Sequence, residues 1–365
     1  MAERKLASVQ KIKNLEPIEG RDRIVLAEIE GWHVIVGKDD FHIGDLCVYI
    51  EIDSVLPERP EFEQARKRAN RVRTMKMAGV YSEGIVYPLT ILPNMINNHA
   101  VSYEQYHEGD DVTAILGITK YDEYAGDDMP CRQVVKKNKY TKWQLFWYKI
   151  FGFPKKKDNE FPSLVSKTDE TRIQNVPDAL KYKNPVVVTE KVDGCSMTAV
   201  LEHTGFFLPK EKFTLASRNR SLEKDNSHYW KIVEEYDLQE RMSLMLNDLN
   251  LPWLAIQGEV AGPAIQSNPY KMKELDFFIF NIITPEGRMG TLEMATLCYQ
   301  YGLGYVPILD SEYILPDTVE EMLKYATGPS LLNPDVLREG VVIRSKDGQK
   351  SFKAVSPEYL VKHGK

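Results

Sequence analysis

The sequence has few of the residues that mark several large protein classes. Its 365 residues include only four cysteines, which lie far apart and form no Cys-x-x-Cys pair. They are too few for a disulfide scaffold, and their spacing does not fit a zinc site. No apolar run approaches the roughly 18 residues of a membrane span, and none follows the N-terminus as a secretory signal would. We therefore expect an intracellular protein, cytoplasmic or in the nucleoid or nucleus, without a membrane partner.

Common catalytic motifs are also absent. The chain contains no His-Glu-x-x-His, no phosphate-binding P-loop, no Gly-x-Ser-x-Gly and no Gly-x-Gly-x-x-Gly, and its seven histidines do not cluster. These absences argue against zinc proteases, P-loop nucleotidases, serine hydrolases and dinucleotide-binding enzymes.

The charge is low overall but unevenly distributed. With 47 Lys+Arg against 53 Asp+Glu, the chain is not a uniformly basic nucleic-acid binder. Two segments nevertheless hold 15 basic residues and one acid, namely residues 66–76 and 131–158. The second also contains seven aromatic residues, a composition that suits backbone tracking and base stacking on nucleic acid. A solvated charge run around a helix with core aromatics remains the alternative. Residues 103–128, with eight acids and one lysine, suggest a solvated linker.

Hydrophobic patterns divide the chain near residue 150. Before it, short apolar runs separated by Gly and Asp predict a small β-barrel. After it, strands such as Val186–Val188 alternate with helical periodicity at 232–246 and at 318–327, where Asp317 is the expected N-cap. We predict an α+β protein, with an OB-like barrel and basic linker in residues 1–150 and a catalytic domain of twisted antiparallel sheets with flanking helices in residues 151–365.

The chemistry begins at Lys191-Val192-Asp193-Gly194, directly after an apolar strand. Desolvation and nearby cations would lower the pKa of such a lysine and make it a nucleophile. Asp193 would share its face if the strand continues, and could hold a metal ion or its water. Alone this motif is weak, and a surface hairpin is the alternative.

Further motifs follow in order: Ser217-Arg218-Asn219, Gly258-Glu259, Phe277–Asn281, Glu339-Gly340 and Lys350–Lys353. With them, the chain resembles the covalent nucleotidyltransferase superfamily of polynucleotide ligases and capping enzymes. Only twelve residues follow the last motif in this sequence, so we expect no barrel after it, and the barrel-like segment comes first. This order, with the run Ser166–Asn175, resembles the RNA ligase 5 family of ATP-dependent RNA ligases.

The resemblance implies a role for each matching residue. Lys191 would attack the α-phosphate of ATP to form lysyl-AMP, AMP would pass to an RNA 5′-phosphate, and a 3′-hydroxyl would then seal the break. Mg²⁺ or Mn²⁺ would be held by Asp193, Glu259 and Glu339. Glu259, Glu339, Arg218 and Lys353 would take part in catalysis. The nucleotide-binding set comprises Glu190, Lys191, Arg218, Glu259, Lys353, Lys350, Lys167, Arg172 and Phe280, with Phe278 as a second choice for stacking on the base.

Other functions stay open at this point. A DNA ligase or a guanylyltransferase-type capping enzyme would use the same motifs, although each normally carries a barrel after them. A non-catalytic OB-fold nucleic-acid-binding protein would also fit the basic segments. We predict an RNA ligase that acts as a monomer on RNA with 5′-phosphate and 3′-hydroxyl ends, at a nick or duplex break.

Overall fold

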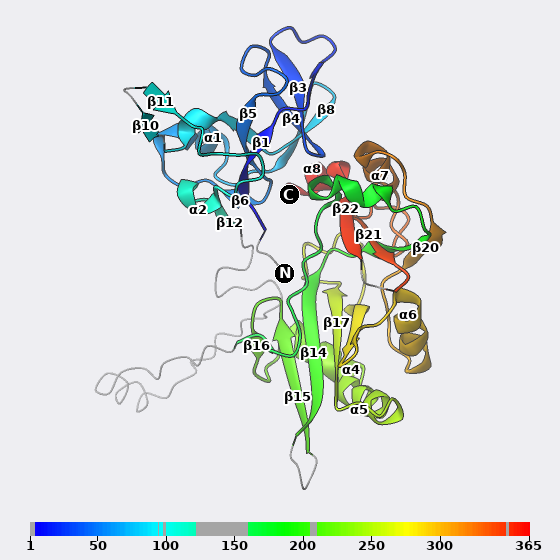
Figure 1. Ribbon diagram of the computed structural model, residues 1–365. Coiled ribbons are helices and arrows are strands. Elements are labelled where there is room, and N and C mark those ends of the chain that lie inside the picture. The colour runs from blue at the N-terminus through cyan, green and yellow to red at the C-terminus, as the bar shows by residue number, and fades with distance from the viewer. Residues whose placement is uncertain (1–3, 94, 98–99, 122–159, 205–209, 348–349) are drawn as a thin grey trace, which may run out of the picture.

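The computed structural model describes residues 4–93, 95–97, 100–121, 160–204, 210–347 and 350–365. The basic and aromatic segment 131–158 lies outside the described residues. Two parts are visible in Figure 1: strands from the first third of the chain form one, and the larger sheets and most helices form the other. Every strand-to-strand pairing in the described sheets is antiparallel, as predicted for the catalytic part.

The N-terminal part consists of short strands around one core. One sheet has the order β1-β5-β9, a second has β2-β3-β4, and three strand pairs complete it. The strands are β1 (Ala7–Lys11), β2 (Asn14–Pro17), β3 (Ile24–Ile29), β4 (Trp32–Gly37), β5 (Leu46–Ile50), β6 (Ser54–Val55), β7 (Thr74–Met77), β8 (Val80–Glu83), β9 (Ile85–Pro88), β10 (Met95–Asn97), β11 (Ala100–Ser102) and β12 (Thr119–Lys120). Two short helices, α1 (Glu63–Arg68) and α2 (Thr113–Leu116), cover them.

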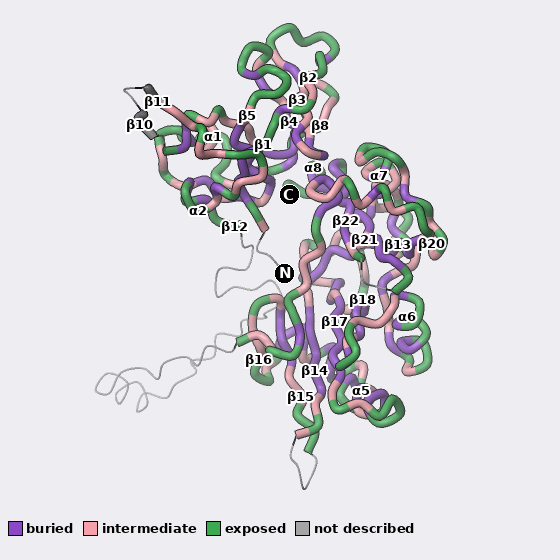
Figure 2. Tube along the Cα trace, in the orientation of Figure 1, coloured by how far each residue is buried: buried purple, intermediate pink, exposed green. Residues whose placement is uncertain are grey.

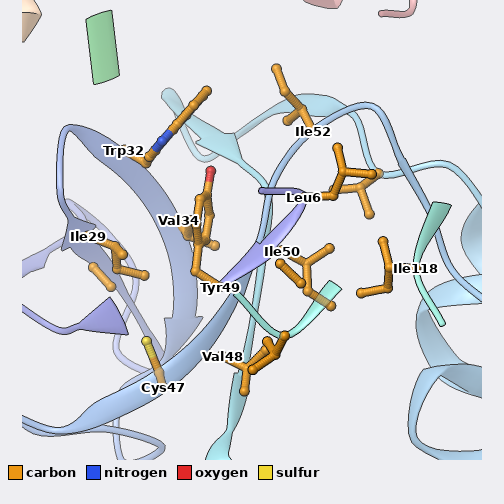
Figure 3. Close-up of a cluster of buried hydrophobic side chains, with 14 of the residues drawn as sticks. Leu6, Ile29, Trp32, Val34, Cys47, Val48, Tyr49, Ile50, Ile52 and Ile118 are labelled. Atoms are coloured by element: carbon orange, nitrogen blue, oxygen red, sulfur yellow. The ribbon is translucent and has the colours of Figure 1, made fainter. Parts of the chain in front are cut away.

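Alternation of apolar residues builds this core. In β3 and β4 every second residue is buried, so each strand turns one face inward. Figure 3 shows the packed side chains, among them Trp32, Tyr49 and Ile118. Ile118 belongs to the segment that the sequence analysis treated as a linker. That prediction was wrong for residues 103–121, because Val112 and Leu116 also fill the core while the acids face outward.

The catalytic part contains two sheets. The larger has the order β16-β15-β14-β17-β18-β19, and the smaller has β20-β13-β21-β22. Their strands are β13 (Val186–Lys191), β14 (Cys195–Thr204), β15 (Lys210–Ser217), β16 (Ser221–Leu222), β17 (Trp253–Ala261), β18 (Asp276–Thr284), β19 (Gly287–Arg288), β20 (Ile308–Tyr313), β21 (Gly340–Ser345) and β22 (Ser351–Val355). The central strands are buried along most of their length (Figure 2).

Helices pack on both sheets. They are α4 (His228–Glu235), α5 (Leu238–Asp248), α6 (Thr291–Gln300), α7 (Val319–Ala326) and α8 (Pro357–His363). Met242 and Met294 join the core of the larger sheet, and Met322 joins that of the smaller one. Among the described residues, no helix is both long and apolar enough to cross a membrane.

Two helix predictions needed correction. The helix expected at 232–246 is divided into α4 and α5 by Asp237, whose φ of 46° lies in the left-handed region. The cap of α7 is Thr318 rather than Asp317, since the Thr318 hydroxyl accepts a hydrogen bond from the Glu321 amide. Asp317 instead forms an ion pair with Lys183 at 2.8 Å.

The two parts share a polar junction. The Trp32 indole N–H donates to Asn175 Oδ1 at 2.5 Å, and Asn175 Nδ2 donates to Glu51 Oε1 at 2.6 Å. The Gly31 amide donates to the Gln174 carbonyl at 3.1 Å, where a β-carbon on residue 31 would lie 2.9 Å from Gln174 Cα. The junction therefore depends on close backbone approach and on one asparagine that links two N-terminal side chains.

We expect Asn175→Ala to lower the free energy of unfolding by about 1–3 kcal/mol, because it leaves the buried indole N–H of Trp32 without its acceptor. Urea unfolding followed by tryptophan fluorescence measures the change. Asn247→Ala, at an exposed position on α5, is the control and should stay within about 0.5 kcal/mol of wild type. Equal stability of both variants would show that the junction adds little to folding.

Candidate active site

A cavity of about 560 Å³ lies where the two catalytic sheets meet. Strands β13, β14, β17, β18, β21 and β22 and the segment 164–170 all contribute to its lining. Directly paired residues explain part of this convergence, because Thr189, Val342 and Lys353 form one row across neighbouring strands and so face the same side. The cavity is lined by the following predicted site residues: Lys167, Glu190, Lys191, Arg218, Glu259, Phe280 and Lys353.

Lys191 ends β13 with its amine in this cavity. Its Nζ donates to Glu339 Oε2 at 2.5 Å. The contact follows from strand register, since Lys191 pairs with Gly340 and Glu339 is the next residue. Glu339 is 7% exposed, so the two opposite charges meet in a largely dry place. The predicted nucleophile and one predicted metal ligand therefore lie together.

Two motif glycines allow the backbones to approach this closely. A β-carbon on residue 194 would lie 2.3 Å from the Val260 carbonyl oxygen of β17. A β-carbon on residue 340 would lie 2.3 Å from the Ala354 carbonyl oxygen of β22. Any side chain at these positions would separate the lysine loop from the strand that carries Glu259, or β21 from the strand that carries Lys353. The glycines that follow Asp193 and Glu339 are thus required for the close packing of these strands.

Glu259 is a half-buried carboxyl group that forms no ion pair with the residues that the structure describes. Burial raises its pKa to about 8, and Glu339 and Asp193 add to this effect while Lys191 and Arg218 oppose it. Such a group gains from a divalent cation, and oxygen donors of this kind suit Mg²⁺ or Mn²⁺. Within the described ranges, no three His, Cys, Asp or Glu side chains form a ready-made metal cluster. The donor chemistry therefore fits a metal ion whose waters fill part of the coordination shell.

Asp193 is not among the residues that line the cavity, and its carboxylate contacts α8. Its carboxylate accepts hydrogen bonds from the Tyr359 hydroxyl at 2.7 Å and from Lys365 Nζ at 2.6 Å, and it is 7% exposed. Its backbone amide donates to the Tyr270 hydroxyl at 2.7 Å. Asp193 is therefore held on both sides by tyrosines.

Asp169 is a site residue that the sequence analysis missed. It forms ion pairs with Lys353 at 2.8 Å, with Lys120 of the N-terminal part at 3.0 Å and with Arg218 at 3.4 Å. Burial alone would raise its pKa, but these cations hold the pKa of Asp169 well below its usual range. Burial also lowers the pKa of Lys353 to about 8, although Asp169 opposes this. Asp169 thus neutralises cations that a phosphate group would need.

The aromatic residues of β18 have different surroundings. Phe280 lines the cavity, whereas Phe278 is buried among Val192, Tyr270 and Val306. The Phe280 carbonyl accepts a hydrogen bond from Arg344 at 2.5 Å, and Arg344 also pairs with Glu170 at 3.1 Å. Phe280 is therefore both accessible from the cavity and fixed at its backbone.

The side chains of three further predicted residues have partners outside the cavity lining, although Glu190 itself lines the cavity. The Glu190 carboxylate accepts hydrogen bonds from Ser330 Oγ at 2.5 Å and from the Leu331 amide at 2.7 Å. Arg172 is buried at the junction, 3.6 Å from Asp53, and two of its guanidinium nitrogens lack a hydrogen-bond partner. Lys350 lies outside the cavity lining with Nζ 4.7 Å from the centre of the Tyr182 ring.

Comparisons with known proteins agree with this geometry. Residues 184–355 match the protein family described as RNA ligase, and residues 6–89 match an OB-fold domain. No curated protein sequence matches the chain. Solved structures of an RNA ligase from Naegleria gruberi are similar over the whole length. The complex with pyrophosphate has 30% identity and a TM-score of 0.79, with 99% of each chain covered.

Two further structures of the Naegleria gruberi enzyme are equally similar. A glutamate-to-alanine mutant with AMP and Mn has 30% identity, and a lysine-to-alanine mutant with ATP and Mn has 31%. Both have a TM-score of 0.79 and cover 99% of each chain. The chain belongs to the RNA ligase family. The predicted enzyme class and the N-terminal OB fold are thereby confirmed, and the DNA ligase, capping-enzyme and non-catalytic alternatives are set aside.

In this ligase the raised pKa of Glu259 predicts a pH-dependent stability. The unfolded carboxyl titrates near its ordinary pKa of 4.5, whereas the folded one titrates near 8. Stability from protonated Glu259 is therefore complete below about pH 4.5 and is lost as the pH rises through 8. In EDTA, the melting temperature of wild type should fall between pH 5 and pH 8 relative to that of Glu259→Gln.

Adding Mn²⁺ at pH 8 should restore the melting temperature of wild type more than that of Glu259→Gln, since only the carboxylate can ionise and meet the metal. The difference between the two proteins isolates residue 259, because all other groups titrate in both. Parallel melting curves at the two pH values would contradict the raised pKa.

Proposed function

We propose that this RNA ligase joins RNA ends through a lysyl-AMP intermediate on Lys191. The observation that carries the proposal is the Lys191 amine in the cavity, 2.5 Å from Glu339 and accompanied there by Arg218 and Lys353. Its cofactors are ATP and a divalent metal ion, Mg²⁺ or Mn²⁺. The Naegleria gruberi structures with ATP, AMP, pyrophosphate and Mn support this choice.

The first step joins the lysine to AMP. Lys191 attacks the α-phosphate, the bond to the β-phosphate breaks, and pyrophosphate leaves. Glu339, which accepts the hydrogen bond from Lys191, is the group placed to hold the amine in line and to accept its proton. Arg218 and Lys353 face the same cavity, where they neutralise charge on the phosphates once Asp169 releases them. Phe280 stacks on the adenine.

In the later steps, the RNA 5′-phosphate takes AMP from Lys191, and the 3′-hydroxyl attacks the activated phosphate and expels AMP. Glu259, Glu339 and Asp193 would hold the metal ion, directly or through its waters, and the bound ion would supply positive charge at the phosphate. Lys167 lines the cavity and is exposed, which suits a contact with the triphosphate or the RNA end.

Incubation with labelled ATP and Mn²⁺ tests the first step. Wild type should become covalently labelled, whereas Lys191→Ala should show at least about a thousandfold less label, because a methyl group cannot act as the nucleophile. Lys181→Ala is the control, since Lys181 is exposed and pairs with Asp178 outside the cavity. Labelling of Lys191→Ala at the wild-type level would refute the proposal.

The RNA is proposed to reach the site over the N-terminal part. In the basic segment 66–76, Arg66 pairs with Glu58 and Arg71 with Asp53, so these two charges are partly neutralised. Arg68, Arg73 and Lys76 form no ion pair with the described residues, and all three are exposed. Their exposure supports a contact with RNA phosphates.

Charge reversal at Arg68, Arg73 and Lys76 should therefore weaken sealing about tenfold or more at moderate salt, with Lys191 labelling nearly unchanged. The control reverses Lys231, Lys273 and Lys324, which are also exposed and form no ion pair within the described part of the chain. Sealing of a nicked duplex and ATP labelling are measured in parallel. Equal loss in both activities, or equal loss of sealing in the control, would show that the three charges do not serve RNA binding.

The preferred break and the assembly complete the proposal. We place the reaction at a nick or duplex break, with one chain acting alone inside the cell, because one chain supplies both the OB fold and the complete motif set. A panel of nicks with RNA or DNA on each side tests the break. Sealing without any preference for RNA at the nick would argue against this choice.

A further inference from the structure

Helix α8 connects the two parts of the ligase at one predicted metal ligand. Tyr359 of α8 is 0% exposed, and its hydroxyl donates to Asp193 Oδ2 at 2.7 Å. An ionised carboxylate only accepts hydrogen bonds, so the phenol must be the donor. Because a tyrosine side chain is rigid beyond its two torsions, this bond fixes the direction of the carboxylate as well as its position.

The same helix is anchored in the core of the N-terminal part. Leu360, the next residue, is 3% exposed and belongs to that core together with Val355. Helix α8 also contacts β7, and it lies beside the N-terminal part in Figure 1. Neighbouring residues of α8 thus face two different structures: Tyr359 contacts the catalytic motif, and Leu360 packs in the OB fold.

The start of α8 is joined to the opposite side of the site. Ser356 caps the helix, since its hydroxyl accepts a hydrogen bond from the Tyr359 amide at 3.2 Å. The Ser356 amide donates to the Glu339 carbonyl at 2.9 Å. Ser356 directly follows β22, the strand whose Lys353 lines the cavity. A shift of α8 would therefore move groups near Glu339 and Asp193 together.

From these contacts we propose that Tyr359 is a positioning residue for the divalent metal ion. Its hydroxyl orients Asp193. Because α8 packs into the OB core, the affinity for the metal also depends on the position of the N-terminal part relative to the catalytic part. This inference rests on the proposed function, in which Asp193 helps to hold the metal. Lys365 also contacts Asp193 at 2.6 Å, so replacing Tyr359 by Phe removes the orienting hydroxyl and leaves that cation in place.

The variant Tyr359→Phe tests the proposal, with Tyr49→Phe as its matched control. Tyr49 is likewise buried, at 1% exposed, and its hydroxyl donates to the Glu83 carbonyl at 2.8 Å in the OB core. Free Mn²⁺ is measured by electron paramagnetic resonance during titration of each protein with AMP present. Labelling of Lys191 is then measured against Mn²⁺ and against ATP, and melting temperature reports stability.

We expect Tyr359→Phe to raise the Mn²⁺ concentration for half-saturation about tenfold in both assays, a usual effect of removing a partner of a metal ligand. The ATP dependence at saturating Mn²⁺ should stay as in wild type. Tyr49→Phe should lower the melting temperature about as much as Tyr359→Phe does, but it should leave the Mn²⁺ titration unchanged. An unchanged Mn²⁺ titration for Tyr359→Phe, or the same shift in Tyr49→Phe, would overturn the proposal.

A second pair of variants tests the link to the OB core. Leu360→Ala loosens α8 without touching Asp193, and Leu116→Ala makes a similar cavity in the same core on α2, where Leu116 is 0% exposed. Leu360→Ala alone should raise the Mn²⁺ requirement, and equal behaviour of the two would refute the link. If wild type takes up no label from ATP and Mn²⁺, the proposed function itself fails. If wild type is labelled and Tyr359→Phe matches it, only this inference fails.

Discussion

The active site depends on the burial of negative charge around one lysine. Glu339 touches the Lys191 amine and Asp193 lies nearby, both with little exposure to water, and the half-buried Glu259 adds a third carboxyl group. Lys191 pairs with Glu339 and Lys365 pairs with Asp193, so among the described residues Glu259 is the carboxyl group of the three that has no ion pair. Burial raises the pKa of Glu259 to about 8, and the charges of Glu339 and Asp193 add to this effect. A divalent metal ion beside Glu259 would oppose this rise, so we expect ionisation of Glu259 and metal binding to be coupled.

On the side of the cavity where the phosphates are proposed to bind, the unbalanced charge is positive. Lys353 and Arg218 face the space that the nucleotide phosphates would occupy, and burial lowers the pKa of Lys353 to about 8. Asp169 pairs with both cations and so offsets the repulsion between them. We expect a bound triphosphate to replace the Asp169 carboxylate as the anion beside Lys353 and Arg218. The carboxylates on one side of the site therefore suit a metal ion, and the cations on the other side suit phosphate.

The motifs allowed much of this arrangement to be predicted from sequence. Lys191, Glu259, Phe280 and Lys353 gather as expected, because short motifs at strand ends meet when the strands pair in register. Asp169 and Tyr359 were missed for a physical reason. Their partners, Lys353 and Asp193, lie 184 and 166 residues away along the chain, and no local pattern records such contacts. The break at Asp237 was also missed, because the helical periodicity of the sequence continues through that residue.

Two contacts connect the N-terminal OB fold to the active site. An N-terminal OB fold could have been tethered only by the segment that precedes the catalytic part. Instead, Lys120 pairs with Asp169 beside the phosphate cations, and Leu360 inserts into the OB core one residue after Tyr359. The OB fold thus contacts the phosphate side through an ion pair and the metal side through a helix. We expect a movement of this domain to change both contacts at once, so that the position of the OB fold and the state of the nucleotide site would be coupled.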